Sequence, residues 1–205
     1  MKLVVFGASG GTGRAAAGQA AARGDEVTAF VRRGDRLHLR QPRVRVVEGD
    51  AFDAAVVSGA VRGQDAVLSL LGARPWRHTE VCSQGMRHIV SAMGEHGVRR
   101  LVAVSWAGVG NSRQELGWFA KHVAVPVMRR AFEDVERMED IVRASDLDWV
   151  IVRPALLTSG SPRGTWRTAL DGSIPGSFIP RADVAAFCLV QLTSDQYIRQ
   201  TPTIA

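Results

Sequence analysis

The sequence predicts an α/β fold: a single-domain, doubly wound parallel sheet with helices on both faces. Short segments rich in valine, isoleucine and phenylalanine alternate with helical patterns along the whole chain, which is typical of β-α-β units. The chain opens with such a unit, because Lys2–Phe6 is apolar and residues 14–22 are mostly alanine. The 205 residues, 46% of them hydrophobic, suffice for the core of one large domain, so we expect a single domain over residues 1–205.

Glycine and proline residues mark the expected ends of the other helices and strands. Gly24 and Gly97 are expected to end helices, because glycine is favoured just past helix C-termini. Pro126 suits the first turn of a helix, and the segment 158–180, rich in glycine, serine and proline, suits loops and short strands. We expect strands at 2–6, 26–31, 44–48, 66–71, 101–105 and 149–152, and helices at 14–22, 83–96, 127–144 and 181–192.

The carboxyl ends of the parallel strands form one edge of the predicted sheet, and ligands bind at that edge in such folds. The residues at those ends therefore mark the expected site: Gly7, Arg32, Asp50, Gly72, Ser105 and Arg153. Loops from residues 73–82, 106–126 and 155–180 are expected to supply most of the substrate pocket.

The turn after the first strand carries a Gly-x-x-Gly-x-x-Gly pattern between a strand and a helix. Gly7 allows the turn, Gly10 lets the backbone approach a pyrophosphate, and Gly13 lets the helix pack closely on the strand. The unpaired N–H groups and the dipole of the helix N-terminus favour a negatively charged ligand. Glycines also mark ordinary turns, but this position favours dinucleotide binding. We expect contacts from Gly7, Ser9, Gly10, Gly11, Thr12 and Gly13.

The end of the second strand indicates which dinucleotide binds. NAD-selective sites usually place a carboxylate there, whereas this strand runs into Arg32 and Arg33. A guanidinium binds a 2′-phosphate through charge-assisted hydrogen bonds. We therefore predict NADP(H), with Arg32 as the main ligand and Arg33 or Arg36 assisting. The alternative interpretation is a solvated basic turn.

Asp50 and Ala51 follow the third strand and are expected near the adenine of the cofactor. The carboxylate of Asp50 can accept a hydrogen bond from the adenine amino group. Asp50 could equally cap the helix that follows, since Asp is favoured at N-caps, and different atoms could serve both roles.

Composition limits the classes of function. The formal net charge is +6 and the pI about 10.5, yet the basic residues are scattered arginines, so nucleic-acid binding is not expected. No apolar run approaches the ~20 residues that span a bilayer, and no signal-peptide pattern precedes the first strand, so we expect a cytoplasmic protein without membrane contact. Cys82 and Cys188 have no metal-ligand spacing and are expected to be buried, reduced thiols; no metal is expected.

Short motifs continue along nearly the whole chain, at residues 7–13, 32–33, 49–50, 71–74, 104–105, 143–147, 152–154, 170–172, 181–185 and 192–197. In order and spacing they resemble the atypical short-chain dehydrogenase/reductase group. The closest likeness is to the biliverdin-IXβ reductase/flavin reductase family and its bacterial relatives with NmrA-like NAD(P)H-binding domains. This resemblance implies a single Rossmann-like domain and an NADPH-dependent reductase.

The resemblance also implies residues along the pyrophosphate and nicotinamide half of the cofactor: Leu71, Gly72, Arg74, Ser105, Pro154, Ala155 and Leu156. The last three would close over the nicotinamide ring. The chain departs from the reductase pattern at Val135 and Ala155, where that family carries histidines. These departures argue against carrying over the tetrapyrrole substrate, but they do not affect the cofactor site.

The chain lacks the Tyr-x-x-x-Lys pair with which ordinary short-chain dehydrogenases protonate a carbonyl oxygen. Its one tyrosine, Tyr197, has no lysine four residues later. Ser105 could hydrogen-bond a substrate oxygen or the nicotinamide carboxamide, or could instead bond to nearby backbone; His122 is a weaker candidate acid. The acidic residues of the 127–144 helix alternate with arginines at i,i+3 and i,i+4 spacing and are expected on a solvated face.

Without a strong side-chain acid, an acceptor with delocalised electrons can take hydride directly and draw its proton from water. We therefore expect hydride transfer from NADPH to a flat conjugated small molecule such as a flavin, a quinone or a tetrapyrrole-like compound, by a monomer or homodimer. A stacking wall is expected from Trp76, Trp106, Trp118 and Trp166, with core filling or a dimer contact as the alternative. The rival functions are a non-catalytic NADP(H)-binding redox sensor or regulator and an isomerase or epimerase.

Overall fold

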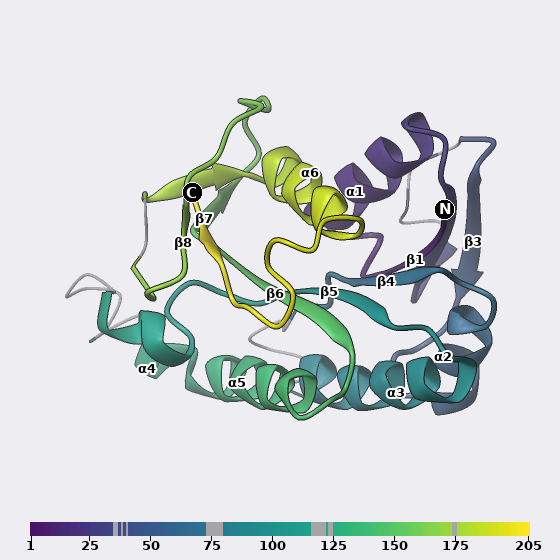
Figure 1. Cartoon of the computed structure of the whole chain (residues 1–205), viewed down its shortest axis with the longest axis horizontal. Helices are drawn as coiled ribbons and strands as arrows, with labels where there is room; N and C mark the ends of the chain where they lie inside the picture. The colour runs from purple at the N-terminus through teal and green to yellow at the C-terminus, as the bar shows by residue number, and fades with distance from the viewer. Residues whose placement is uncertain are drawn as a thin grey trace.

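The computed structural model describes residues 1–34, 37, 39, 41–72, 80–115, 122, 125–173 and 176–205. An eight-stranded sheet forms its centre, in the order β3-β2-β1-β4-β5-β6-β10-β8 (Figure 1). The parallel strands that the sequence predicts are β1 (Lys2–Phe6), β2 (Glu26–Val31), β3 (Val44–Glu48), β4 (Ala66–Ser69), β5 (Arg100–Val104) and β6 (Asp148–Pro154). The strand order reverses between β1 and β4, as in doubly wound sheets that bind ligands at this point. The expected fold class is confirmed.

Short strands complete the structure beyond β6. The last strand, β10 (Thr203–Ile204), lies parallel to β6, and β8 (Thr168–Ala169) lies antiparallel to β10 at the sheet edge. A separate two-stranded sheet pairs β7 (Leu156–Thr158) with β9 (Phe178–Pro180). The short strands within 158–180 were expected, whereas β10 was not, because a two-residue strand carries no alternation of apolar and polar residues that a sequence can reveal.

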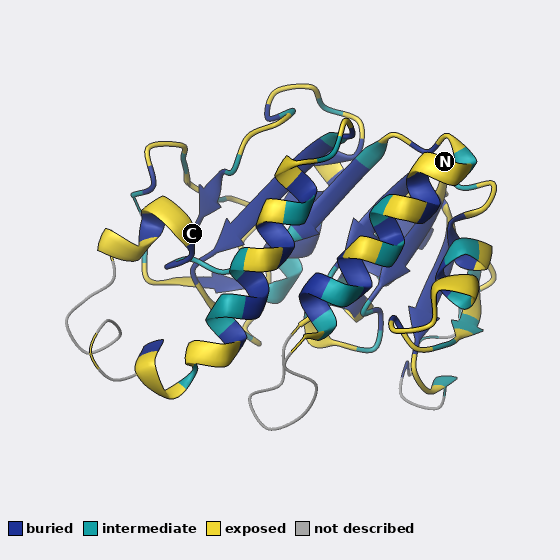
Figure 2. Cartoon of the chain, turned by 90° about the horizontal axis from the view of Figure 1, so that it is seen from below, coloured by how far each residue is buried: buried dark blue, intermediate teal, exposed yellow. Residues whose placement is uncertain are grey.

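Helices cover both faces of the sheet (Figure 1). On one face lie α1 (Gly11–Ala22) and α6 (Arg181–Gln191); on the other lie α2 (Ala54–Val61), α3 (Val81–His96) and α5 (Arg129–Arg143). The 3-10 helix η2 (Gly110–Glu115) and the short α4 (Val125–Val127) follow β5. Along each of these helices, buried positions alternate with exposed ones (Figure 2). Two apolar cores result, one on each face.

Small side chains explain how α1 fits between the sheet and α6. Ala16, Ala17 and Ala20 are fully buried, and α1 contacts both β1 and α6. Alanine in a helix forgoes little side-chain entropy and lets the helix axis approach its neighbours closely. The alanines of α1 thus favour helix formation and also allow close packing against α6 and the sheet.

The predicted boundaries hold to within about two residues at most ends. β6 is longer than predicted and includes Pro154, because proline is tolerated at a strand end where its missing N–H is not needed. The helix predicted at 127–144 begins only at Arg129, after the separate turn α4. Both cysteines are buried and neither forms a disulfide, as expected; burial also raises the pKa of the Cys188 thiol.

No helix among the described residues combines the length and the apolar character that crossing a membrane requires.

Asp53, and not Asp50, caps the helix after β3. Asp53 Oδ1 accepts hydrogen bonds from the amides of Ala55 (3.0 Å) and Val56 (3.2 Å) at the N-terminus of α2. Asp50 Oδ1 instead accepts from the Phe52 amide (3.1 Å), which makes a local turn. The capping alternative for Asp50 was therefore wrong: α2 begins one turn later than Asp50 would require.

Replacing Asp53 with alanine should destabilise the protein by about 1 kcal/mol, because two amides at the start of α2 lose their acceptor. Urea unfolding monitored by circular dichroism would measure the change. Asp50→Ala is the matched control, with a smaller expected loss because it removes only one acceptor in a turn. Equal losses for the two variants would contradict the assignment of the cap.

Candidate functional site

The sheet topology brings the predicted cofactor residues to one edge. Because β3, β2, β1 and β4 are parallel neighbours, the residues that follow them stand in the same order: Asp50, Arg32, Gly7 and Leu71. The ends of β1 and β4 also lie in close contact, since a Cβ on Gly7 would overlap the Leu70 carbonyl. The strand order reverses at this point, so the site that the sequence predicts coincides with the crevice that the topology predicts.

The glycine turn has the backbone geometry expected of a phosphate site. Gly7 has a φ of 76°, in the left-handed region that favours glycine. A Cβ on Gly13 would overlap the Gly7 carbonyl oxygen and the Ala8 Cα, so only glycine allows α1 to start so close to β1. The roles predicted for Gly7 and Gly13 agree with this geometry.

The N-terminus of α1 offers amide groups to a ligand. Gly10 occupies the N-cap and no side chain caps the helix, so the first amides of α1 have no intrahelical acceptor. Gly10 and Gly11 are exposed, while Ser9 and Thr12 are partly buried beside them. Uncapped and exposed amides at the positive end of a helix dipole fit the pyrophosphate of a dinucleotide.

The basic residues after β2 are placed as a 2′-phosphate site requires. Arg32 and Arg33 are both exposed at the carboxyl end of this strand, one strand away from the glycine turn. Arg36 lies outside the described residues. Asp50, exposed at the end of β3, borders Arg32 on the side away from β1. The geometry is compatible with the predicted roles, which remain predictions.

The residues after β4 lie on the other side of the glycine turn from Arg32. Leu71 is partly buried and Gly72 is exposed, with open space where its Cβ would be. Ala51 is buried, and its carbonyl oxygen lies 2.9 Å from Nδ1 of His88 on α3. The methyl group of Ala51 faces α3, since a Cβ built on Gly85 would lie 3.1 Å from it. Arg74 and Trp76 lie outside the described residues.

Ser105 belongs to a buried ionic cluster under the end of β5. Its side chain has no exposed surface, and Oγ donates a hydrogen bond to Glu139 Oε1 (2.5 Å). Arg153 donates to the same carboxylate from Nε (2.9 Å) and Nη2 (2.6 Å). Arg143 Nη2 donates to Glu139 Oε2 (2.5 Å), the oxygen that also accepts from Arg153 Nη2. The Ser105 hydroxyl is thus engaged inside the protein by a side chain, which favours a structural role; its contact with cofactor or substrate stays a prediction.

Electrostatics keeps Glu139 charged. Burial raises the pKa of its carboxyl group, but the hydrogen bonds and charge of Arg153, with Ser105 and Arg143, outweigh burial and hold the pKa below its usual value. The cluster also reaches the loop after β5, since Arg153 Nη1 donates to Asn111 Oδ1 (2.5 Å). The buried cluster around Glu139 therefore joins α5, β6, η2 and the residue that follows β5.

The solvated face predicted for the acidic residues of α5 is partly wrong. Arg129–Glu133 and Asp140–Arg143 form the expected exposed or partly exposed ion pairs. Glu139 and Asp134, in contrast, have no exposed surface. Asp134 accepts from the Cys82 and Ser83 amides and the Ser83 hydroxyl, and so caps α3 from outside that helix. Charge spacing along α5 could not distinguish its solvent face from the face that packs on the sheet.

The nicotinamide end of the predicted site is formed by the segment after β6. Pro154 and Ala155 are buried, and each is bonded through its backbone to a neighbouring strand or loop. Leu156 is 69% exposed and paired with Phe178 of β9, which is 52% exposed. Among the predicted closing residues, only Leu156 therefore presents a side chain that a ligand can reach.

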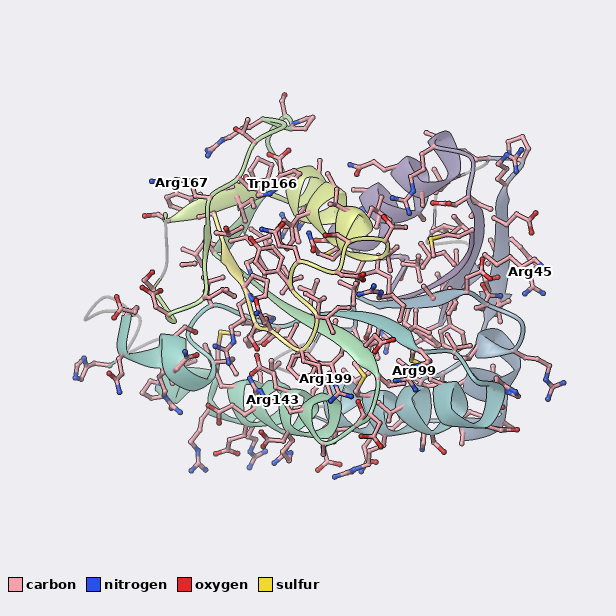
Figure 3. All side chains as sticks on the ribbon, viewed as in Figure 1. Arg45, Arg99, Arg143, Trp166, Arg167 and Arg199 are labelled. Atoms are coloured by element: carbon pink, nitrogen blue, oxygen red, sulfur yellow. The ribbon has the colours of Figure 1, made fainter. Side chains whose placement is uncertain are left out.

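The tryptophans that the structure describes pack on the protein. Trp106 meets Phe132 edge to face, and Trp166 meets Phe187 in the same way (centroids 5.2 and 5.6 Å apart). Figure 3 shows Trp166 beside α6. Both are partly buried against the apolar cores, which favours the core-filling alternative for them. Trp118 lies outside the described residues, and His122 is exposed.

Two residues that the sequence analysis did not select are functional candidates. Glu139 lies on the face of α5 that carries Val135 and Val142, four residues before and three after it, and this register is the signal that could have revealed its burial. Arg181 at the start of α6 lies against Gly11, which no local pattern reveals because 170 positions separate the two residues. No cluster of potential metal ligands occurs among the described residues.

Comparisons with known proteins identify relatives of this chain. A reductase from Streptomyces griseus, (4-alkanoyl-5-oxo-2,5-dihydrofuran-3-yl)methyl phosphate reductase, is 32% identical over 93% of this chain, which spans 63% of that relative's length. YwnB of Bacillus subtilis, an uncharacterised protein, is 25% identical over 100% of this chain and 98% of its own. The crystal structure of ChuY, an anaerobillin reductase from Escherichia coli O157:H7, superposes with a TM-score of 0.86 at 27% identity, covering 100% of this chain and 96% of that one.

A match to the family described as NAD(P)H-binding extends over residues 7–195, from the glycine turn to beyond α6. The match includes every strand end that forms the crevice, and it confirms the predicted cofactor class and the resemblance to atypical short-chain dehydrogenases/reductases. The chain is a member of the NAD(P)H-binding family and has the fold of its oxidoreductases.

Proposed function

We propose that this protein is an NADPH-dependent reductase that transfers hydride to a flat, conjugated small molecule. The observation that carries the proposal is the pairing of uncapped α1 amides with exposed arginines at the next strand end. The first group suits a pyrophosphate and the second a 2′-phosphate. NADPH, when bound, supplies the hydride; the chain holds and orients it.

The hydroxyl groups of Ser105 and Tyr197 support an acceptor that needs no strong acid from the protein. Ser105 donates a hydrogen bond to Glu139, and this carboxylate stays ionised and therefore holds no proton to give. Tyr197 is buried and hydrogen-bonds with Thr168 (3.2 Å) and Gln196 (3.1 Å). Among the described residues, these groups are committed to the fold. A conjugated acceptor can spread the charge it receives and take its proton from water.

The relatives are consistent with a conjugated acceptor. The name of the Streptomyces griseus reductase describes a dihydrofuran ring that carries an oxo and an alkanoyl group, so its ring double bond is conjugated with carbonyl groups. ChuY is named as an anaerobillin reductase. Both names describe the reduction of a small molecule, and the first describes a conjugated one. We propose the same kind of reaction for this chain.

Steady-state oxidation of NADPH, followed at increasing concentrations of a flavin, a quinone, a tetrapyrrole and an unsaturated furanone, tests the proposal. We expect saturable turnover with at least one of them. Tight NADPH binding without turnover on any would instead favour a redox sensor, because Ser105 and Tyr197 are committed to internal hydrogen bonds.

Arg32→Glu should reverse the cofactor preference. The substitution removes a cation from the end of β2 and adds a carboxylate that repels a 2′-phosphate and accepts from a ribose 2′-hydroxyl. We expect the ratio of the NADPH to the NADH dissociation constant to rise by about 100-fold or more, from two effects of about 1.4 kcal/mol each. Arg62→Glu, the same charge change at the exposed end of α2, is the matched control. An unchanged ratio in Arg32→Glu would remove Arg32 from the site.

A further inference from the structure

The side chain of Arg181 crosses the N-terminus of α1. An ideal Cβ built on Gly11 would lie 2.7 Å from Arg181 Cδ and 3.1 Å from its Nε. Arg181 is the first residue of α6, and α6 packs beside α1 on the same face of the sheet (Figure 1). The guanidinium therefore belongs to α6, but it lies beside the glycine turn, whose amides are available to a ligand.

The hydrogen bonds of Arg181 use only part of its donor capacity. Nη1 donates to Ser159 Oγ (3.1 Å) and, more weakly, to the Leu157 carbonyl (3.5 Å), both beyond β6. Within the described residues, Nε and Nη2 make no hydrogen bond and no carboxylate pairs with the guanidinium. A guanidinium has five N–H donors in a planar fork, so the three N–H groups of Nε and Nη2 remain for another acceptor.

No carboxylate compensates the charge of Arg181 within the part of the chain that the structure describes. It occupies the first turn of α6 and lies over the first turn of α1, and both helix ends carry the positive pole of a dipole, where a cation is unfavourable. Asp183, the acid in the first turn of α6, is buried and accepts from the Arg163 (2.8 Å) and Gly164 (3.0 Å) amides. An anion bound at the α1 amides would compensate all of these positive groups.

We propose that Arg181 binds the pyrophosphate of NADP(H) from the side opposite the α1 amides, a cofactor-binding role for a residue outside the glycine turn. The proposal rests on the NAD(P)H site that the proposed function uses. Through Ser159 and the Leu157 carbonyl, the same side chain ties the segment after β6 to the phosphates. Arg181 thus couples the nicotinamide end of the site to the pyrophosphate.

This role gives a reason for the second glycine of the Gly10-Gly11 pair. Gly7, Gly10 and Gly13 have positions in the dinucleotide pattern, whereas Gly11 has none. A side chain at position 11 would displace Arg181. The absence of a Cβ at Gly11 therefore leaves room for the Arg181 side chain beside the turn.

Calorimetric titration with NADP⁺ and with adenosine 2′-monophosphate, which has no pyrophosphate, tests the proposal. Arg181→Gln should raise the NADP⁺ dissociation constant by about 10- to 100-fold, the range for a charged hydrogen bond. It should leave binding of adenosine 2′-monophosphate unchanged, which also shows that the variant is folded. Arg32→Glu should weaken both ligands, which distinguishes the two arginines.

The Gly11→Ala variant supplies a second test. It should weaken NADP⁺ in the wild-type background because it displaces Arg181, and have a markedly smaller effect when Arg181 is already glutamine. Equal effects in the two backgrounds would overturn the proposal, as would wild-type NADP⁺ affinity in Arg181→Gln.

The anion at Arg181 could also come from the acceptor. If Arg181→Gln keeps its NADP⁺ affinity but the NADP⁺-saturated variant loses binding of methyl phosphate, the arginine serves a substrate phosphate and the pyrophosphate assignment is overturned. Failure of the inference leaves NADP⁺ binding to the wild-type protein intact. Failure of the proposed function would appear as no cofactor binding or no turnover in the wild type.

Discussion

Glu139→Gln will destabilise the protein by about 3 kcal/mol or more, the range observed when one partner of a buried ion pair is removed. Arg153 is 1% exposed and Glu139 has no exposed surface, so the substitution leaves a buried guanidinium without a counter-charge. The same carboxylate also accepts from Ser105 and Arg143, so three partners lose a charged acceptor at once. Urea unfolding at neutral pH measures the loss.

Two further variants distinguish a charge effect from a packing effect. Glu133→Gln removes a carboxylate of the same helix that is 43% exposed and pairs with Arg129 at 3.6 Å, so its cost should stay within about 0.5 kcal/mol. Replacing Glu139 and Arg153 together with methionine should recover much of the loss, because no unpaired charge then remains buried. A loss in Glu139→Gln no larger than in Glu133→Gln would refute the assigned role.

The same cluster predicts a pH dependence. The pKa of Glu139 is lower in the folded protein than its usual 4.5, so its contribution to stability is complete above that value. The contribution falls as the pH drops from 4.5 through the folded-state pKa. The difference in stability between wild type and Glu139→Gln should therefore shrink below pH 4.5. A difference that does not vary with pH would contradict this.

Gly13→Ala will weaken NADPH binding by at least about tenfold, or 1.4 kcal/mol, and will also destabilise the fold by about 1–3 kcal/mol. The added methyl would overlap the Gly7 carbonyl oxygen and the Ala8 Cα, which are backbone atoms and cannot rotate away. The turn must therefore open and α1 must withdraw from β1. Because the ligand-binding amides belong to that turn, affinity should fall together with stability.

Gly18→Ala is a stringent control, because it makes the same substitution in the same helix. A Cβ at Gly18 would meet only side-chain atoms at 3.8 and 3.9 Å, which is ordinary contact. Alanine is a better helix former than glycine, so this variant should be more stable by about 0.5–1 kcal/mol and bind NADPH as the wild type does. If the two variants bind NADPH equally well, close approach of α1 to β1 does not determine the site.

The sequence by itself determined the fold class and the cofactor class, and it predicted the sheet edge at which the cofactor is expected. These follow from local patterns: apolar segments alternating with helices set the parallel sheet, and the glycine turn between strand and helix sets the phosphate site. Because parallel strands end at one edge, the order of elements was enough to bring Gly7, Arg32 and Asp50 together.

Only the tertiary structure decided which charged residues are buried and which meet across the fold. Glu139 and Glu133 look alike in sequence, yet one pairs with Arg153 under the sheet and the other faces solvent, because burial depends on which face of α5 packs. Likewise, Arg181 reaches Gly11 only because α6 packs beside α1. Local patterns report periodicity along the chain, whereas these contacts arise from the packing of helices far apart in it, and packing decides where a charge is desolvated and what must compensate it.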